Sequence, residues 1–145
     1  DMQIGVETSR AVETKRVFVV DDDDINRAVL QFMLQDENET HDLASLPEAY
    51  AKAGRGAPNL LLLGLSVVER EGPALLGALA ARWAGLRILL IAEAGAGAAG
   101  EAMLKHGAHG VLLKPLTVET VRRKTDVQLG RVVSSLVQLS LAPAR

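Results

Sequence analysis

Short, continuous apolar runs alternate along this chain with segments of helical periodicity, and this alternation constrains the fold more than any other feature. Runs that stay apolar at every position, instead of at every second one, are typical of strands buried on both faces of a parallel sheet. The runs predict five strands, over residues 16–20, 41–45 (the weakest), 60–63, 87–91 and 110–113. Helices are expected between them over 25–35, 47–53, 73–83 and 98–106. The pattern predicts an α/β domain with helices covering a parallel sheet.

The length and composition favour a single domain and exclude several classes of function. A chain of 145 residues with 48% hydrophobic content can bury one core. A net charge of −2 argues against a nucleic-acid surface, and the absence of cysteine excludes disulfides, thiolate catalysis and cysteine-ligated zinc. The apolar stretches are too short to span a bilayer, and residues 1–15 lack a signal pattern. We therefore expect a cytoplasmic protein with no membrane or direct nucleic-acid contact.

Four consecutive aspartates, Asp21 to Asp24, follow the first apolar run directly. The carboxyl ends of strands are where open α/β sheets place their sites. Two carboxylates about 4 Å apart repel by roughly 4 kcal/mol at an effective dielectric near 20, so such a cluster needs a cation or a lysine nearby. Asp24 as the N-cap and Asp23 near the positive helix end would explain half of the run. Asp21 and Asp22 remain as candidates for a site.

The carboxyl-terminal part of the chain leaves two interpretations open. A helix is expected from Thr117, and its apolar positions keep near-heptad spacing beyond Gly130. Either two helices are divided at Gly130, or one extended helix continues through it and pairs with a second copy as a coiled coil. The expected divisions are a disordered segment over 1–14, a folded domain over 15–129 and a helical extension or linker over 130–145, with a possible homodimer through the last helix.

Four stretches of this sequence carry a resemblance to a known family: VFVVDDDDINR, PNLLLLGLSVVEREG, RILLIAEAG and GAHGVLLKPLT. Over residues 15–129 the chain resembles the receiver domain of two-component response regulators, and it is most similar to the receivers of hybrid histidine kinases. The resemblance implies a flavodoxin-like (βα)5 fold with a five-stranded parallel sheet of order 2-1-3-4-5 and, here, an extended C-terminal helix. It also identifies Asp21 and Asp22 as the family's acidic pair and Lys114 as its lysine.

The same resemblance implies that the phosphorylation site is degenerate. The phosphoacceptor aspartate matches Gly64, the hydroxyl residue after strand four matches Ala92, and the aromatic switch residue matches Val111. The usual proline after the phosphoacceptor is Val68. Without a carboxylate nucleophile, acyl-phosphate chemistry is not expected, so we expect no catalytic residue and no enzyme. A single engineered substitution could explain Gly64 but not Ala92 and Val111, which favours a natural pseudo-receiver.

Glu93 stands where family receivers usually carry a small residue. We hypothesise that Lys114 pairs with Asp21, Asp22 or Glu93, as an internal substitute for the metal and the phosphoryl group. The alternative is that Glu93 points to solvent. Magnesium binding at Asp21 and Asp22 is expected to be weak at most, because the third carboxylate is missing, and no other cofactor is expected.

Two function hypotheses from different classes follow. The first is a non-phosphorylatable signalling module that acts by protein contact, as a docking or autoinhibitory domain for a kinase or output domain of the same pathway. Its contact face would span about residues 98–129. The second is a small-molecule sensor for a ligand such as a cyclic dinucleotide, which would need arginines and stacking rings. The candidates are Arg55, Arg70, Arg82, Arg87, Trp83 and Tyr50.

Overall fold

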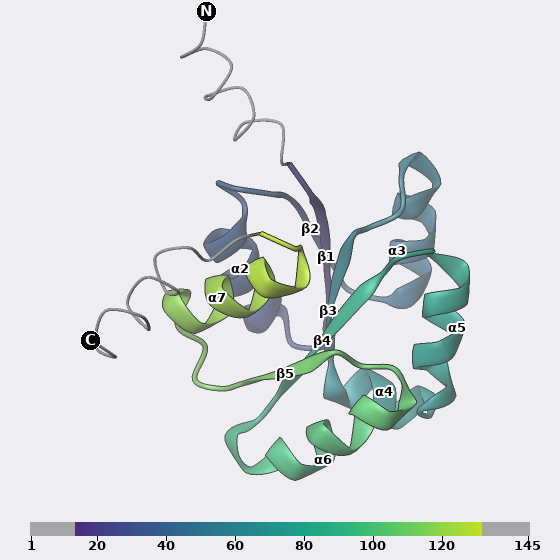
Figure 1. Cartoon of the computed structure of the whole chain (residues 1–145), viewed down its shortest axis with the longest axis vertical. Helices are drawn as coiled ribbons and strands as arrows, with labels where there is room; N and C mark the ends of the chain where they lie inside the picture. Colours follow the sequence, from purple (N-terminus) through teal and green to yellow (C-terminus); the bar gives the residue numbers. More distant parts are fainter. Residues whose placement is uncertain (1–13, 132–145) are drawn as a thin grey trace, which may run out of the picture.

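The computed structural model describes residues 14–131, which form one parallel sheet covered by helices on both faces (Figure 1). The sheet has five strands in the order β2-β1-β3-β4-β5, and every neighbouring pair is parallel. The strands are β1 (Arg16–Val20), β2 (Glu39–Leu43), β3 (Leu60–Gly64), β4 (Arg87–Ala92) and β5 (Gly110–Leu113). The predicted flavodoxin-like fold and strand order are confirmed.

The continuous apolar runs form strands because both faces of the sheet are buried. In β3, residues Leu60 to Leu63 are all fully buried, with alternate side chains entering two separate cores. Leu61 and Leu63 pack with Phe18 on one face, whereas Leu60 and Leu62 pack on the other. Each such side chain stabilises the fold by about 1.5–3 kcal/mol through burial. The sheet therefore holds the carboxyl ends of β1, β3, β4 and β5 in a fixed arrangement.

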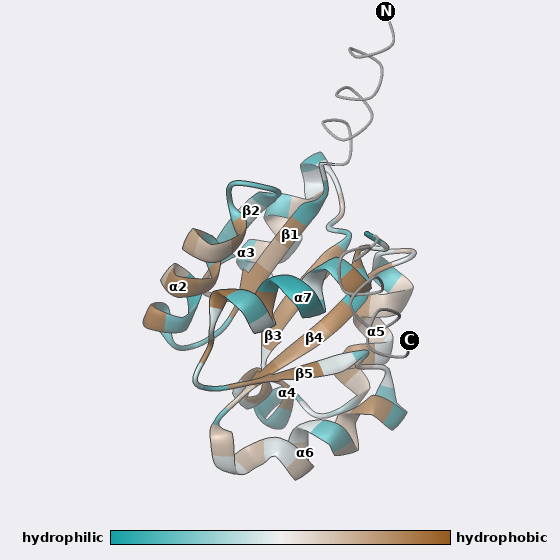
Figure 2. Cartoon of the chain, turned by 60° about the vertical axis from the view of Figure 1, so that its left-hand side comes forward, coloured by the Kyte–Doolittle hydropathy of each residue, from teal (hydrophilic) through white to brown (hydrophobic). Residues whose placement is uncertain are grey.

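Two helices, α2 (Asp24–Leu34) and α7 (Val118–Gln128), lie side by side on one face of the sheet (Figures 1 and 2). The other face is covered by α3 (Leu46–Lys52), α4 (Leu65–Glu71) and α5 (Ala74–Arg82). The short helix α6 (Gly97–Glu101) packs beside β5. Three turns of 3₁₀ helix complete the described chain: η1 (Ala53–Arg55), η2 (Ala94–Ala96) and η3 (Ala102–His106).

Two predicted elements differ from the structure, and one helix was not predicted. The second strand begins and ends two residues earlier than the predicted range 41–45. In place of the predicted helix 98–106, the chain forms the short helix α6 followed by the 3₁₀ helix η3. The glycines at 95, 97 and 100 disfavour a longer helix here. Helix α4 was not predicted at all; it begins directly after Gly64 and ends at Gly72, whose φ of 97° suits glycine.

Helix α7 ends at Gly130 in a Schellman motif. Gly130 has a φ of 75°, its N–H donates to the Val127 carbonyl at 3.2 Å, and the Arg131 N–H donates to the Asp126 carbonyl at 2.9 Å. This pattern closes a helix and redirects the chain. Of the two interpretations, the continuous helix through Gly130 is therefore wrong, and a break at Gly130 is confirmed. Residues 1–13 and 132–145, on which the predicted disordered segment and dimerising extension fall, lie outside the described residues.

Between residues 14 and 131, none of the helices combines the length and the hydropathy that crossing a bilayer would require.

Candidate functional site

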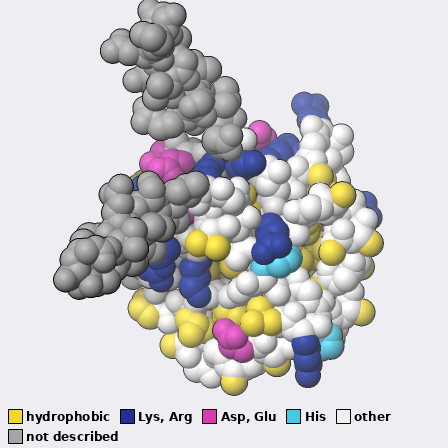
Figure 3. Space-filling model, viewed as in Figure 1, with side chains coloured by type: hydrophobic (Ala, Val, Ile, Leu, Met, Phe, Trp, Pro, Cys, Tyr) yellow, Lys and Arg dark blue, Asp and Glu magenta, His cyan; other side chains and the backbone are white. Residues whose placement is uncertain are grey.

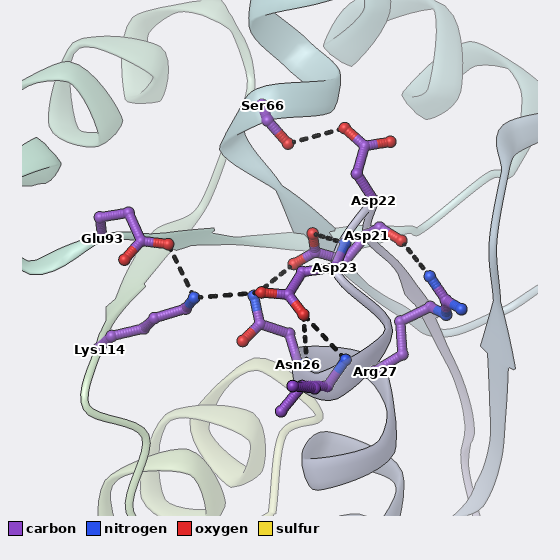
Figure 4. A network of polar contacts seen from close by, with 9 residues as sticks. Asp21, Asp22, Asp23, Asn26, Arg27, Ser66, Glu93 and Lys114 are labelled. Atoms are coloured by element: carbon purple, nitrogen blue, oxygen red, sulfur yellow. Dashed lines mark hydrogen bonds and ion pairs between the residues drawn. The ribbon is translucent and has the colours of Figure 1, made fainter.

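The candidate site is a pocket of about 190 Å³ where the carboxyl ends of β1, β3 and β4 meet. Residues that follow or end these strands line it, together with the first turns of α2 and α4. The lining includes Asp21, Asp22, Asp23, Asn26, Gly64, Ser66, Ala92 and Glu93. Figure 4 shows the polar side chains around it, with Lys114 approaching from the end of β5. The sheet thus brings together most of the site residues that the sequence predicts.

The Asp21 carboxylate is buried and turned inward, with only 4% of the residue exposed. Its Oδ1 accepts a hydrogen bond from the Asp23 N–H at 3.0 Å, and its Oδ2 accepts one from Asn26 Nδ2 at 3.1 Å. The Asp21 backbone carbonyl accepts from Arg27 Nη1 at 2.7 Å. A buried carboxylate is stable only with such donors. Asp21 is therefore held in one orientation by its own chain segment.

Gly64 is glycine because of space and not because of its backbone conformation. Its φ of −59° is open to any residue. A Cβ atom at this position would lie 2.8 Å from both Cγ and Oδ1 of Asp21. The Asp21 carboxylate therefore takes up the room that any side chain at position 64 would need. Sequence reasoning identified the missing nucleophile but gave no sign of this close approach.

Asp22 turns away from Asp21 and toward helix α4. Its Oδ2 accepts hydrogen bonds from Arg70 Nη1 at 2.8 Å and from Ser66 Oγ at 3.0 Å. The hydrogen bond from Arg70 is the main cause that lowers the pKa of Asp22; burial opposes it, and the hydrogen bond from Ser66 adds a smaller lowering. The partner of Asp22 is thus Arg70, which sequence reasoning had placed among ligand-binding arginines.

Asp23 is the N-cap of α2, where Asp24 was predicted. Its Oδ1 accepts from the N–H groups of Ile25 at 2.8 Å and Asn26 at 3.3 Å, while Asp24 lies in the first turn. These backbone hydrogen bonds are the main cause that lowers the pKa of Asp23, and the charge of Lys114 lowers it further. The prediction was off by one residue because either aspartate can cap a helix.

Lys114 forms an ion pair with Glu93. The Lys114 Nζ lies 2.7 Å from Glu93 Oε2 and 3.6 Å from Asp23 Oδ2, and its side chain is 24% exposed. The hydrogen bond to Glu93 is the main cause that raises the pKa of Lys114. Of the three partners considered, Glu93 makes the direct contact, and Asp23 is a second partner that the sequence did not indicate.

Ala92 and Val111, the two other positions that the resemblance identifies, are buried and apolar. Ala92 lines the pocket without a hydroxyl group, and Val111 lies inside the sheet against α6. A Cβ added to Gly100 of α6 would lie 3.0 Å from Val111 Cγ1, so this valine and the glycine are closely packed. Neither position offers a hydrogen-bonding side chain to a group bound in the pocket.

The donor set is not arranged for tight magnesium binding. Magnesium favours octahedral oxygen ligands, and carboxylates must point at it together. Here Asp21 is bonded to its own segment and Asp22 points to Arg70. Within residues 14–131 there is no group of three or more acidic or histidine side chains arranged to hold a metal. Weak binding at Asp21 and Asp22 stays a prediction.

The residues suggested for a cyclic dinucleotide are not assembled into a stacking site. Trp83 is only 5% exposed and packs edge-on against Phe18, with ring centroids 6.0 Å apart. The Arg82 guanidinium covers the Tyr50 ring at 4.1 Å. Arg87 bonds to Gln128, and Arg55 lines a separate groove beside β2. The rings are therefore used in packing.

Comparison with known proteins agrees with this architecture. The family model for the response regulator receiver domain matches residues 17–126. A search of curated proteins gives no match. Among solved structures, NtrX from Brucella abortus in complex with ADP superposes with a TM-score of 0.73 at 22% identity, covering 91% of this chain and 29% of NtrX.

Two isolated receivers superpose over nearly their whole length. The N-terminal signal receiver domain of a Bacteroides fragilis response regulator gives a TM-score of 0.71 at 18% identity, covering 82% of this chain and 99% of that one. A Thermotoga maritima response regulator gives 0.68 at 18% identity, with coverages of 81% and 98%. At these identities the superpositions show the fold, and the family match spans the site from Asp21 to Lys114. The chain belongs to the response regulator receiver domain family.

Proposed function

We propose that this receiver domain does not take up a phosphoryl group and acts in a two-component pathway by contact with another protein. The observation that carries the proposal is the close approach of the Asp21 carboxylate to Gly64. Acyl-phosphate formation needs a carboxylate nucleophile at the end of β3. Here that position has no side chain, and a neighbouring carboxylate fills the space beside it.

The charges of the site support the same proposal, because they are balanced internally. Asp22 is paired with Arg70, and Lys114 is paired with Glu93 and Asp23. A phosphoryl group and a metal would have to compete with these contacts. The conformation of the site is then determined by its internal ion pairs and by the bound partner protein, and not by phosphorylation. The kinase or an output domain of the same pathway is the proposed partner.

The proposed contact surface is the groove between α6, β5 and α7. It has a volume of about 310 Å³ and is lined by Gly97, Glu101, Val111, Leu113, Thr120 and Lys124. Leu113 is 43% exposed at its edge. Figure 3 shows hydrophobic side chains on this face of the molecule, over β5 and α6. Val111, which stands at the family's switch position, lines the groove. It lies on β5, next to β4, whose last residue Ala92 lines the candidate site.

Phosphorylation can be tested directly. The domain is incubated with magnesium and acetyl phosphate or phosphoramidate, beside an intact receiver as the positive control, and its mass is measured. We expect no phosphoryl adduct on this chain under conditions that modify the control. A stoichiometric adduct would contradict the proposal.

The contact surface needs a separate test in the full-length protein. A Leu113→Asp substitution places a charge in the groove and is expected to abolish the signalling output without changing the melting temperature. Leu104→Asp is the matched control, because Leu104 is 38% exposed in η3 and does not line the groove. Equal effects of the two substitutions would argue against the groove as the contact surface.

A further inference from the structure

The start of β5 is bonded to β4 through a histidine. The Ile88 N–H donates to His109 Nδ1 at 2.9 Å, and the His109 N–H donates to the Ile88 carbonyl at 2.8 Å. His109 thus bonds to both backbone groups of Ile88, one residue before the pairing of β4 and β5 begins at Leu89 and Gly110. We call these two hydrogen bonds the His109 latch.

The Ile88 N–H depends on the histidine ring for its acceptor. The Arg87 N–H donates to the Asn59 carbonyl on the β3 side of β4, whereas the next residue, Ile88, turns its N–H toward β5. Ile88 is fully buried. A buried backbone N–H without a partner costs free energy comparable to a lost hydrogen bond. The ring therefore satisfies a donor that the fold has withdrawn from water.

This geometry determines which ring nitrogen carries the proton. A backbone N–H can only donate, so His109 Nδ1 accepts with its lone pair and the neutral ring carries its proton on Nε2. A second proton has to bind at Nδ1, the atom that accepts from Ile88. The protonated ring would point an N–H group at the Ile88 N–H, and the hydrogen bond between them would be lost.

The surroundings of the ring disfavour its charged form. Burial is the main cause that lowers the pKa of His109, and the positive charge of Arg87 lowers it further. Arg87 donates to an uncharged partner on α7, Gln128, at 2.9 Å. Lys105 and His106, at the end of η3, are exposed. In the part of the chain that the structure describes, no acidic side chain forms a hydrogen bond or ion pair with the ring, so a second proton has no counter-charge in contact.

We propose that the His109 latch is acid-sensitive and that protonation of the ring releases the start of β5 from β4. Because β5 is an edge strand with a single strand neighbour, its start is the part of the sheet that this loss loosens first. The folded-state pKa of His109 is lowered, so the stabilisation is complete above the ordinary value of 6.5. It is lost as the pH falls from there through the folded-state pKa.

The His109 latch is connected to the groove of the proposed contact surface. Strand β5 carries Val111 and Leu113, which line that groove. Lys124 of α7 donates to the Val111 carbonyl at 2.8 Å and holds the strand two residues beyond the latch. A loosened start of β5 therefore changes the lining of the groove. The effect on partner binding rests on the proposed function, whereas the acid sensitivity of the latch does not.

Amide hydrogen exchange tests the latch in the full chain. Protection of the Ile88 amide, corrected for the intrinsic exchange rate, is measured at about pH 8 and about pH 5, the range in which histidine titrates. We expect protection to fall on acidification, by up to about tenfold for each pKa unit by which His109 is lowered. Equal protection of Ile88 at the two pH values would overturn the proposal.

A His109→Asn substitution separates titration from structure. The asparagine Oδ1 can accept from the Ile88 N–H in place of Nδ1 and does not titrate. Protection of Ile88 should therefore no longer depend on pH in this variant. His106→Asn is the matched control, because His106 is exposed in η3, and it should keep the wild-type pH dependence. A pH dependence that survives in His109→Asn would contradict the proposal.

Nitrogen NMR of the imidazole rings gives a second measurement on the unsubstituted chain. At about pH 8, His109 should carry its proton on Nε2, and acidification should add one at Nδ1 while the Leu113 methyl shifts change. A neutral ring with its proton on Nδ1 would overturn the proposal. Release of Ile88 with unchanged Leu113 shifts would support the latch and contradict its connection to the groove.

Discussion

The two halves of the site differ in the chemistry of their side chains and in how these side chains are held. In the acidic half, the carboxylates of Asp21, Asp22 and Asp23 accept hydrogen bonds from the chain itself, and Asp24 lies in the first turn of α2. The small-residue half, Gly64, Ala92 and Val111, has no functional group and is closely packed. The acidic cluster is therefore balanced within the chain, because nearby basic side chains and backbone N–H groups interact with its carboxylates.

The halves should also differ in how they respond to substitution. Exposed ion pairs contribute roughly 0–1 kcal/mol each, whereas volume added to a packed interior typically costs about 1–3 kcal/mol. Changes in the small-residue half should therefore be the more damaging ones. Four substitutions test this difference, beginning with the largest expected effect.

Gly64→Asp should lower the free energy of unfolding by about 3 kcal/mol or more. The new Cβ would meet Asp21 at 2.8 Å, and the new carboxylate would be buried beside another one. Urea denaturation measures the effect. Gly54→Ala is the control, because no atom lies within 4 Å of a Cβ at that position, and it should be close to neutral. If Gly64→Asp has wild-type stability, the acidic half is not fixed and the comparison fails.

Asp21→Ala should lower the free energy of unfolding by about 2 kcal/mol, since Asn26 loses the acceptor of its buried side-chain hydrogen bond. It should also relieve the close approach at Gly64. In a double-mutant cycle, Gly64→Ala should cost less in the Asp21→Ala background than in the wild type. Strict additivity of the two substitutions would show that they do not interact.

Lys114→Met should lower the free energy of unfolding by about 1 kcal/mol or less at neutral pH, because Glu93 is exposed. The folded-state pKa of Lys114 is raised, so its contribution is complete below the ordinary value of 10.5 and is lost as the pH rises through the folded-state pKa. Wild-type and variant stabilities should therefore converge in strong alkali. The exposed Lys105→Met serves as control. A difference that persists in strong alkali would argue against the ion pair.

Arg70→Gln should have the smallest effect on stability and a clear effect on the titration of Asp22. The hydrogen bond from Arg70 lowers the pKa of Asp22, so the substitution should raise it toward the ordinary value of 3.8. In the wild type, this contribution to stability is present above pH 3.8 and is lost as the pH falls through the lower folded-state pKa. Carboxyl NMR titration measures the change. Arg123→Gln, an exposed arginine of α7, should leave Asp22 unchanged.

The sequence predicted the sheet well, because continuous apolar runs report burial on both faces. It did not predict α4; the apolar residues Leu65 and Val68, three apart and followed by Gly72, were the available signal. The sequence marks Gly130 as a possible helix break. Only its φ and the hydrogen bonds of the Schellman motif distinguish a break from a continuous helix.

Side-chain partners were harder to predict than positions. The pair of Asp22 and Arg70 joins residues 48 apart, and only the placement of α4 beside β1 brings them together. Lys114 and Glu93 could be considered as a pair because both follow neighbouring strands of the sheet. The inward turn of Asp21 over Gly64 depends on hydrogen bonds within the β1–α2 turn, which no sequence pattern specifies.

The contact between Asp21 and Gly64 also has an evolutionary consequence. A phosphoacceptor introduced at position 64 in one step would arrive in space that is already taken, so a gain of chemistry would begin with a loss of stability. If the chain is not phosphorylated, as we propose, a substitution that repositions Asp21 would have to precede a carboxylate at position 64. The residues at positions 21 and 64 therefore constrain each other's substitution.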